Sequence, residues 1–194
     1  MAAVCALAPV LMAIVAAWPE SMWPLQGATI GLLAAAAAWS MDESAAAVVD
    51  SLPRSLRWRT AARATALVPL ALTWAGCILV AGDRLPPHAG VFLLQGAAAL
   101  LFAVAVATWR RAGGSATPGM RLGSATVGVA AVVALVRPLP ETLPLFPLWD
   151  FEAWTRSLAL WSGLAAGSAV LLAAALADRR VAYARGRWRS SCAT

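Results

Sequence analysis

The sequence contains no lysine, and charge of either sign is scarce. All fifteen basic residues are arginine. Charged residues make up 12% of the chain, against about 25% in an average soluble domain. Hydrophobic residues make up 61% of the 194 positions, so a soluble domain of this length has too few charged side chains to cover its apolar surface. The composition excludes a soluble globular protein and indicates an integral membrane protein.

Residues that carry catalysis or bind metals are also few. The single histidine, His88, has no second histidine or acidic partner at a metal-ligand spacing, and we expect it to be a solvated loop residue. Cys5, Cys77 and Cys192 lie far apart in the chain, which predicts reduced thiols. A phosphate-binding loop requires a lysine that this chain does not have. We therefore expect no catalytic site, no cofactor and no metal in this chain.

The charges are clustered, and six charge-free runs lie between the clusters: residues 1–19, 21–41, 64–82, 85–109, 122–136 and 157–177. A helix needs about 20 apolar residues to cross a bilayer, and all but one of the runs reach or nearly reach that length. Run 122–136 is short by about one turn, but Arg121 and Arg137 can extend it by reaching to the two membrane surfaces. The sequence thus predicts an all-α protein with one domain of six transmembrane helices, residues 1–178, and a basic tail, residues 179–194.

The arginines predict which side of the membrane each loop faces. Twelve of the fifteen lie after the second run, after the fourth run or in the tail, and only Arg84, Arg137 and Arg156 lie on the other side. Positively charged loops stay in the cytoplasm, so both termini are predicted to be cytoplasmic. The first run has no basic segment before it, and we expect Val4–Ala17 to be a retained helix and not a signal peptide. The net charge of +6 then indicates contact with anionic lipid and no nucleic acid partner.

Tryptophans and glycines fit this arrangement of helices. Indole side chains favour the headgroup level of a membrane. We expect this position for six tryptophans, at the outer helix ends Trp18, Trp23, Trp149 and Trp154, and at the inner ends Trp39 and Trp109. Gly27–Gly31 and Gly163–Gly167 have the small-xxx-small spacing that lets two helix backbones approach closely.

The segment between the second and third runs predicts a short amphipathic helix on the cytoplasmic surface. Ser40 and Glu43 have the spacing of a capping box, and Pro53 ends the helix. Apolar residues recur at helical spacing along one side: Met41, Ala45, Val48, Val49 and Leu52. Acidic residues lie on the other side: Asp42, Glu43 and Asp50. A basic, aromatic stretch that suits lipid headgroups follows: Arg54, Arg57, Trp58 and Arg59. An ordinary interfacial linker is the alternative interpretation.

The outer loop between the fifth and sixth runs is unusually apolar and contains four prolines within residues 137–154. Such a segment is expected to dip into the outer leaflet or to pack on the bundle as a broken helical hairpin. Its charged and aromatic residues then form an outer gate or vestibule: Arg137, Glu141, Phe146, Trp149, Asp150 and Trp154. The alternative is a cap held in place by hydrophobic burial.

Taken together, these features resemble the permease subunits of ABC exporters, in the branch that moves drugs, antibiotics, lipids and polysaccharides. The stretch from Ser40 to Arg54 is similar to an acidic loop of small actinobacterial permeases. The resemblance implies that Met41–Leu52 is a coupling helix seated in a groove of a separate ATPase, with Asp42, Glu43 and Asp50 facing that partner. It also implies a second permease chain, identical or paralogous, a bacterial cytoplasmic membrane, and ATP and Mg²⁺ bound by the ATPase.

Two other classes of protein remain open on the sequence. A membrane subunit that anchors or scaffolds a larger complex has the same composition, and a lipid-modifying enzyme requires activity from this chain alone. An ATPase of roughly 25–35 kDa, the size of an ordinary nucleotide-binding domain, distinguishes the exporter if it stays bound through detergent. The apolar spans favour an amphipathic or hydrophobic cargo.

The predicted topology shields Cys192 from reagents outside intact cells. With Cys5 and Cys77 replaced by alanine, a membrane-impermeant maleimide should label Cys192 only after the cells are permeabilised, because the tail is predicted to be cytoplasmic. The same variant should require detergent for extraction from membranes. Ready labelling of intact cells, or a well-behaved particle in detergent-free buffer, would contradict this topology.

Overall fold

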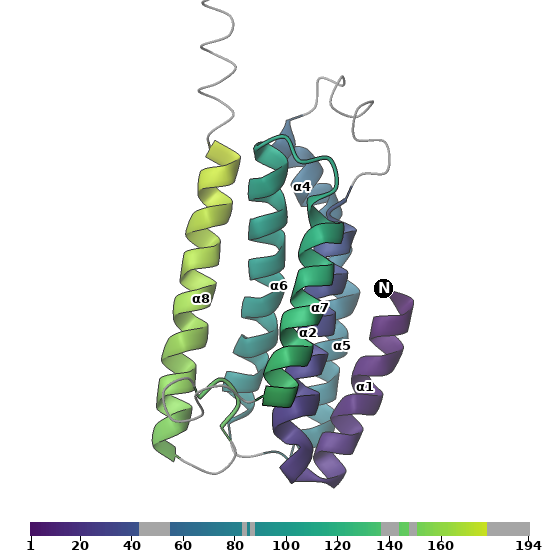
Figure 1. Cartoon of the computed structure of the whole chain (residues 1–194), viewed down its shortest axis with the longest axis vertical. Coiled ribbons are helices and arrows are strands. Elements are labelled where there is room, and N and C mark those ends of the chain that lie inside the picture. The colour runs from purple at the N-terminus through teal and green to yellow at the C-terminus, as the bar shows by residue number, and fades with distance from the viewer. Residues whose placement is uncertain (43–54, 83–84, 86–87, 137–143, 148–150, 178–194) are drawn as a thin grey trace, which may run out of the picture.

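The computed structural model describes residues 1–42, 55–82, 85, 88–136, 144–147 and 151–177, and the regular elements in these ranges are all helical. The elements are α1 (Ala2–Ala17), the short 3₁₀ helix η1 (Pro19–Ser21), α2 (Met22–Ser40), α4 (Leu56–Ala64), α5 (Leu67–Ala81), α6 (Ala89–Ala112), α7 (Pro118–Val136) and α8 (Phe151–Ala177). The long helices lie side by side and run up and down the bundle (Figure 1). The all-α prediction is confirmed.

Three helical stretches in the described part of the chain are long and apolar enough to cross a membrane: Leu56–Ala81, Ala89–Ala112 and Glu152–Ala177. The first of these comprises α4 and α5, which meet at a turn. Each of the six charge-free runs coincides with a helix, α1 being a shorter apolar one.

Two helices begin earlier than the charge pattern predicts. Helix α7 begins at Pro118, a residue favoured in the first helical position because its fixed φ suits the helix and no N–H is needed there. The helix is therefore 19 residues long and contains Arg121, which the pattern of charge-free runs places outside it. Helix α8 begins at Phe151 and includes Glu152 and Arg156. Charged residues at helix ends thus conceal the true helix boundaries from a search for charge-free runs.

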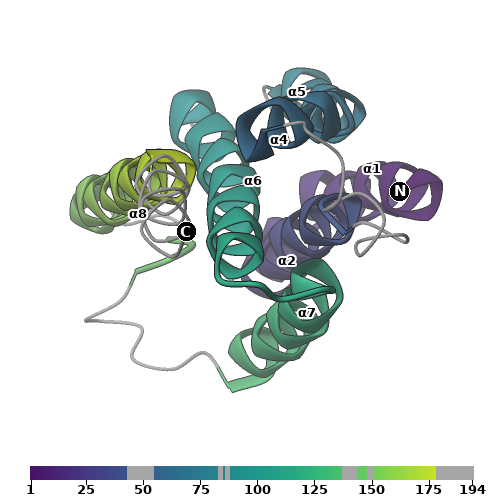
Figure 2. The same cartoon turned by 90° about the horizontal axis from the view of Figure 1, so that it is seen from above.

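Helices α2 and α6 lie at the centre of the bundle (Figure 2). Helix α2 packs mainly against α7, and α6 mainly against α8, while α1 and α5 pack together on another side. Most residues of α2 are buried, and its C-terminal half contains a buried run of alanines, 34–38. Such small side chains let neighbouring helices approach, so the bundle is held by close backbone packing as well as by large apolar side chains.

Helices α2 and α7 approach each other through glycine. A Cβ atom on Gly31 would clash with the Cβ atom of Ala130, and one on Gly123 would lie 2.5 Å from Nε1 of Trp39. Gly31 belongs to the predicted Gly27–Gly31 pair, which therefore supports close packing within the chain. The second predicted pair is different, because a Cβ atom on Gly163 or Gly167 would meet nothing within 4 Å.

The tryptophans of the predicted belts differ in their exposure. Trp18, Trp39 and Trp109 are exposed near helix ends. Trp23 is buried, and its Nε1 donates a hydrogen bond of 3.1 Å to the backbone oxygen of Val133. A helix carbonyl therefore satisfies the indole N–H of Trp23, and this side chain packs inside the bundle near the start of α2.

Close packing at Gly31 predicts a stability difference between two alanine variants. Gly31→Ala introduces a clash with α7 and should lower the free energy of unfolding by about 1–3 kcal/mol. Gly163→Ala is the matched control, since it adds a methyl group in open space and gains helix propensity of up to about 1 kcal/mol. Unfolding in detergent measures both, and equal stability of the two variants would contradict the α2–α7 contact.

Candidate functional sites

The first candidate site lies where α2 ends and α7 begins. Oδ1 of Asp42 accepts a hydrogen bond of 2.6 Å from the backbone N–H of Gly119, and Oδ2 accepts one of 2.6 Å from Met120. The first amides of a helix have no partner within the helix, and they carry the positive end of its dipole. Asp42 therefore acts as the N-cap of α7, although it belongs to another part of the chain.

Arg63 of α4 supports the same site from the other side. Its Nη1 donates to the backbone oxygen of Ser40 at 3.3 Å and also to that of Asp42. The last carbonyls of a helix lack partners, and a cation suits the negative end of the helix dipole. These five residues, Ser40, Asp42, Arg63, Gly119 and Met120, form what we call the Asp42 junction, in which three helix ends meet.

The structure corrects the predicted start of the amphipathic helix. Ser40 is the last residue of α2, and its hydroxyl donates to the carbonyl of Ala37 at 2.7 Å, while its predicted capping-box partner, Glu43, lies outside the described residues. Met41 is buried beside Val104 and Ala107 and does not belong to a surface stripe. Asp42, predicted to face a partner protein, binds the start of α7 through both of its carboxylate oxygens. The other predicted coupling residues lie outside the described residues: Glu43, Val48, Val49 and Asp50.

The described part of the basic segment after the predicted amphipathic helix lies in α4, which has one exposed face and one buried face. Ser55 caps α4, its Oγ accepting from the backbone N–H of Trp58 at 3.3 Å. Arg57 and Trp58 are exposed, in keeping with the predicted contact with lipid headgroups. Arg59 is buried, because it lies one helical turn after the buried Leu56 and so faces the bundle. The predicted surface role of Arg59 is therefore wrong, and that of Arg54 lies outside the described residues.

The second candidate site lies at the opposite end of the bundle, where residues 144–147 pack against the helices. The backbone oxygen of Leu145 accepts three hydrogen bonds, from Nε2 of Gln95 at 3.2 Å, from Oγ of Ser157 at 3.1 Å and from Nε1 of Trp161 at 3.1 Å. Gln95 lies on α6, and the other two donors lie on α8. The short segment is thus attached to two helices through a single carbonyl.

The next residue, Phe146, is enclosed by aromatic rings. Its ring centroid lies 5.6 Å from that of Trp23 in an edge-to-face arrangement and 5.9 Å from that of Trp161. A Cβ atom on Gly27 would lie 3.1 Å from Cε2 of Phe146, so this glycine leaves room for the ring. Of the predicted alternatives, the structure favours packing on the bundle with burial of an apolar side chain for this part of the loop.

Two buried glutamines complete this end of the bundle. Gln26 and Gln95 are both 0% exposed, and Nε2 of Gln26 donates to Oε1 of Gln95. Within the part of the chain that the structure describes, Oε1 of Gln26 has no hydrogen-bond partner. An unsatisfied buried carbonyl oxygen is costly, so its position is a feature to be explained. We call the group formed by Gln26, Gln95, Ser157, Trp161 and residues 144–147 the Leu145 site.

Sequence reasoning missed these glutamines because it searched the runs for charge. A neutral amide among alanines and leucines scarcely lowers the mean hydropathy of a run. A simple signal was present, since Gln26 and Gln95 are the only glutamines in the chain and each lies in a Leu-Gln-Gly sequence.

The sequence predicted that Trp154 lines a vestibule, but the structure does not place it there. Its side chain is buried, with its rings 5.3 Å from Phe92 and 4.7 Å from His88, both at the start of α6. His88 is half-buried in this stack and is not the solvated loop residue that we expected. The remaining predicted gate residues lie outside the described residues: Arg137, Glu141, Trp149 and Asp150.

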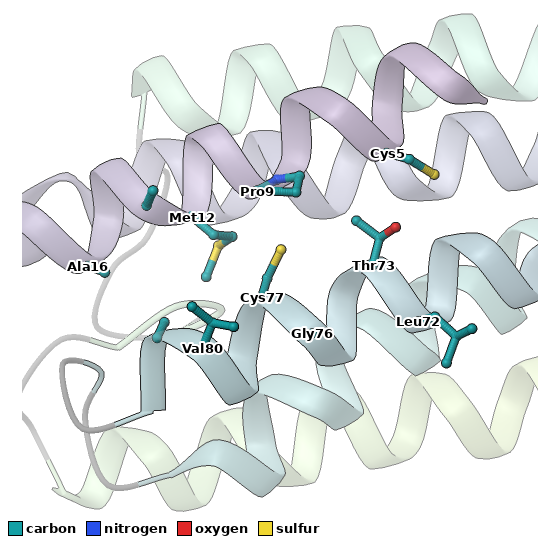
Figure 3. A pocket seen from close by; sticks show the side chains of 11 residues that line it. Cys5, Pro9, Met12, Ala16, Leu72, Thr73, Gly76, Cys77 and Val80 are labelled. Atoms are coloured by element: carbon teal, nitrogen blue, oxygen red, sulfur yellow. The ribbon is translucent and has the colours of Figure 1, made fainter.

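An apolar groove of about 390 Å³ lies between α1 and α5 (Figure 3). The side chains of Cys5, Met12 and Cys77 point into it, and Thr73 contributes a hydroxyl at its edge. Its lining contains no charged side chain. The groove therefore offers apolar contact, two thiols and one hydroxyl.

Comparison of the chain with protein-family models, curated proteins and solved structures gives no match. Functional inference therefore depends on the two candidate sites themselves.

The cap on α7 predicts a loss of stability when Asp42 is changed. Asp42→Ala removes both acceptors and should lower the free energy of unfolding by about 0.5–2 kcal/mol, the usual range for loss of an N-cap. Asp42→Asn keeps one oxygen acceptor and should cost less. Thermal unfolding in detergent compares the two variants with the native chain, and an unchanged midpoint for Asp42→Ala would show that the carboxylate does not cap the helix.

Proposed function

We propose that the chain is the membrane-spanning permease subunit of an ABC exporter, with six spans and both termini in the cytoplasm of a bacterial cell. In this proposal the six helical bodies α1, α2, α4–α5, α6, α7 and α8 each cross the cytoplasmic membrane. A separate ATPase binds ATP and Mg²⁺, and a second permease chain completes the transport pathway. The coincidence of each charge-free run with a helix supports the six spans, and the distribution of arginine supports their direction.

The Asp42 junction is the observation that carries the proposal. Residues 43–54, the segment predicted to contact the ATPase, follow directly after Asp42 and precede α4. Asp42 is hydrogen-bonded to the start of α7, and Arg63, one helix after the segment, is hydrogen-bonded to the end of α2. A force applied to such a segment acts on three helices at once. This is what a coupling element requires, since it must transmit closure of the ATPase to the bundle.

The Leu145 site supports the proposal at the other end of the bundle. A transport pathway requires a closed outer side in one conformation and an open one in another. Residues 144–147 are held by hydrogen bonds to the carbonyl of Leu145 and by the enclosed ring of Phe146. Both kinds of contact can be broken without unfolding a helix. The segment is therefore suited to be the outer gate, with Phe146 as its central side chain.

Charge reversal in the predicted coupling segment tests the proposal without disturbing the cap on α7. The double variant Glu43→Arg and Asp50→Arg leaves Asp42 in place and should reduce cargo-stimulated ATP hydrolysis at least tenfold, because the introduced arginines would repel the basic groove expected on the ATPase. The measurement uses the complex purified from its native membrane and reconstituted in vesicles.

Glu20→Arg is the matched control, since Glu20 is exposed at the opposite end of the bundle and its reversal should leave coupling unchanged. Full stimulation in the double variant would contradict the assignment of the segment. If no ATP-binding chain stays with the protein through mild detergent, the exporter proposal fails in favour of a membrane scaffold subunit.

A further inference from the structure

The hydrogen bonds at Leu145 are more numerous than the carbonyl needs. A backbone oxygen has two lone pairs and is satisfied by one or two donors. Here an amide, a hydroxyl and an indole N–H all converge on it, from two different helices. Gln95 and Ser157 are also linked to each other, at 3.5 Å between Nε2 and Oγ, so the donors form a connected group. Such a group is built to receive a carbonyl oxygen at one position.

The surroundings of Phe146 select for shape beside that carbonyl. Trp23 and Trp161 lie against the ring from α2 and α8, and Gly27 leaves the space that it fills. Trp161 takes part in both contacts, through its Nε1 to the carbonyl and through its ring to Phe146. The position of the polar contact and that of the apolar contact are thus set by the same side chains.

Gln26 adds an acceptor that the chain itself does not use. Its amide is anchored through Nε2 to Gln95, which leaves Oε1 buried and without a donor among the described residues. A partner with an N–H or O–H group at this point would remove the cost of that buried oxygen. The side chains that define the Leu145 site are all neutral, and a buried charge without a partner would be strongly unfavourable.

We infer that the Leu145 site binds a neutral molecule that carries a carbonyl oxygen next to an aromatic or bulky apolar group, together with one hydrogen-bond donor. In the present conformation the chain's own Leu145 and Phe146 occupy the site in place of that ligand. Gln95, Ser157 and Trp161 recognise the carbonyl, Trp23 and Trp161 enclose the apolar group, and Gln26 accepts from the donor. This inference rests on the proposed function in one respect, because it names the class of cargo that the exporter would carry.

The test removes the occupying ring and offers a small molecule in its place. N-acetyl-L-phenylalaninamide reproduces the carbonyl, the ring and the N–H donors, and toluene reproduces the ring alone. In Phe146→Ala, purified in detergent without any ATPase, the amide should bind in ligand-observed NMR and raise the unfolding temperature, as a ligand of the native state does. The native chain should bind it at least tenfold more weakly, because the site is already occupied. Phe146→Leu, which also shortens the side chain, serves if the alanine variant does not fold.

Second substitutions separate recognition of the carbonyl from filling of a cavity. Adding Gln95→Leu or Ser157→Ala to Phe146→Ala should weaken binding of the amide about tenfold, the effect of a lost buried hydrogen bond. Adding Ser168→Ala to Phe146→Ala should not weaken binding of the amide. Ser168 is a buried serine of α8, the helix that carries Ser157, and its Oγ makes no hydrogen bond to Leu145. Binding of toluene should be indifferent to all three substitutions.

Equal affinity for the amide and for toluene, or no effect of Gln95→Leu, would overturn the inference, as would the absence of binding to both Phe146 variants. The outcome is independent of the exporter proposal, because neither ATPase nor transport enters the measurement. Binding without a co-purifying ATPase would remove the exporter and keep the site. ATP hydrolysis coupled to this chain, without binding of the amide, would keep the exporter proposal and remove the site.

Discussion

The two hydrogen bonds from Asp42 to the first amides of α7 are the interaction on which the arrangement of the central helices depends. Pro118 begins α7, and the acceptor for the amides of Gly119 and Met120 comes from Asp42, beyond the end of α2. The cap brings α7 against α2 at the level of Gly119, where a Cβ atom would clash with the carbonyl oxygen of Ala38. Close packing continues along the pair to Gly31. Electrostatic pairing at the end and small side chains along the interface therefore support each other.

The helices were predictable from the sequence because a charge-free run shows the length and the apolar composition that a membrane-spanning helix requires. Their ends were not, because Arg121 and Glu152 lie inside helices, near the N-termini of α7 and α8, and a search for charge-free runs places them outside. The candidate sites were predictable only in outline. The sequence suggested that Asp42 faces a partner protein. Its role as a cap for α7 depends on a contact between distant segments, and the spacing of the residues around Asp42 does not show that contact. Packing of the Phe146 loop on the bundle was one of two alternatives that the sequence left open, whereas the glutamines beside it were missed because neutral amides do not interrupt a hydrophobic run.

Both candidate sites include α2, which gives them a physical connection. Asp42 follows the last residue of this helix, and Gln26 lies near its first, roughly 24 Å away at 1.5 Å per residue. A helix of closely packed alanines has little freedom to bend, so a displacement at one end is carried to the other as a shift of the whole element. Helix α6 lies beside it and supplies Gln95, which bridges Gln26 to the Leu145 carbonyl. A shift of α2 relative to α6 would therefore strain the hydrogen bond between the glutamines.

The order of these contacts bears on how a closed bundle could open. The ring of Phe146 touches α2 through Trp23 and Gly27 and touches α8 through Trp161, so it remains in place only while α2 and α8 keep their separation. The carbonyl of Leu145 is held by α6 and α8, which pack closely against each other and offer it a stable support. Movement of α2 would thus release the ring first and leave the carbonyl attached. An exchange of the chain's own Phe146 for a cargo group then requires no loss of the polar contacts until the cargo carbonyl is close enough to replace them, which keeps the buried donors satisfied throughout.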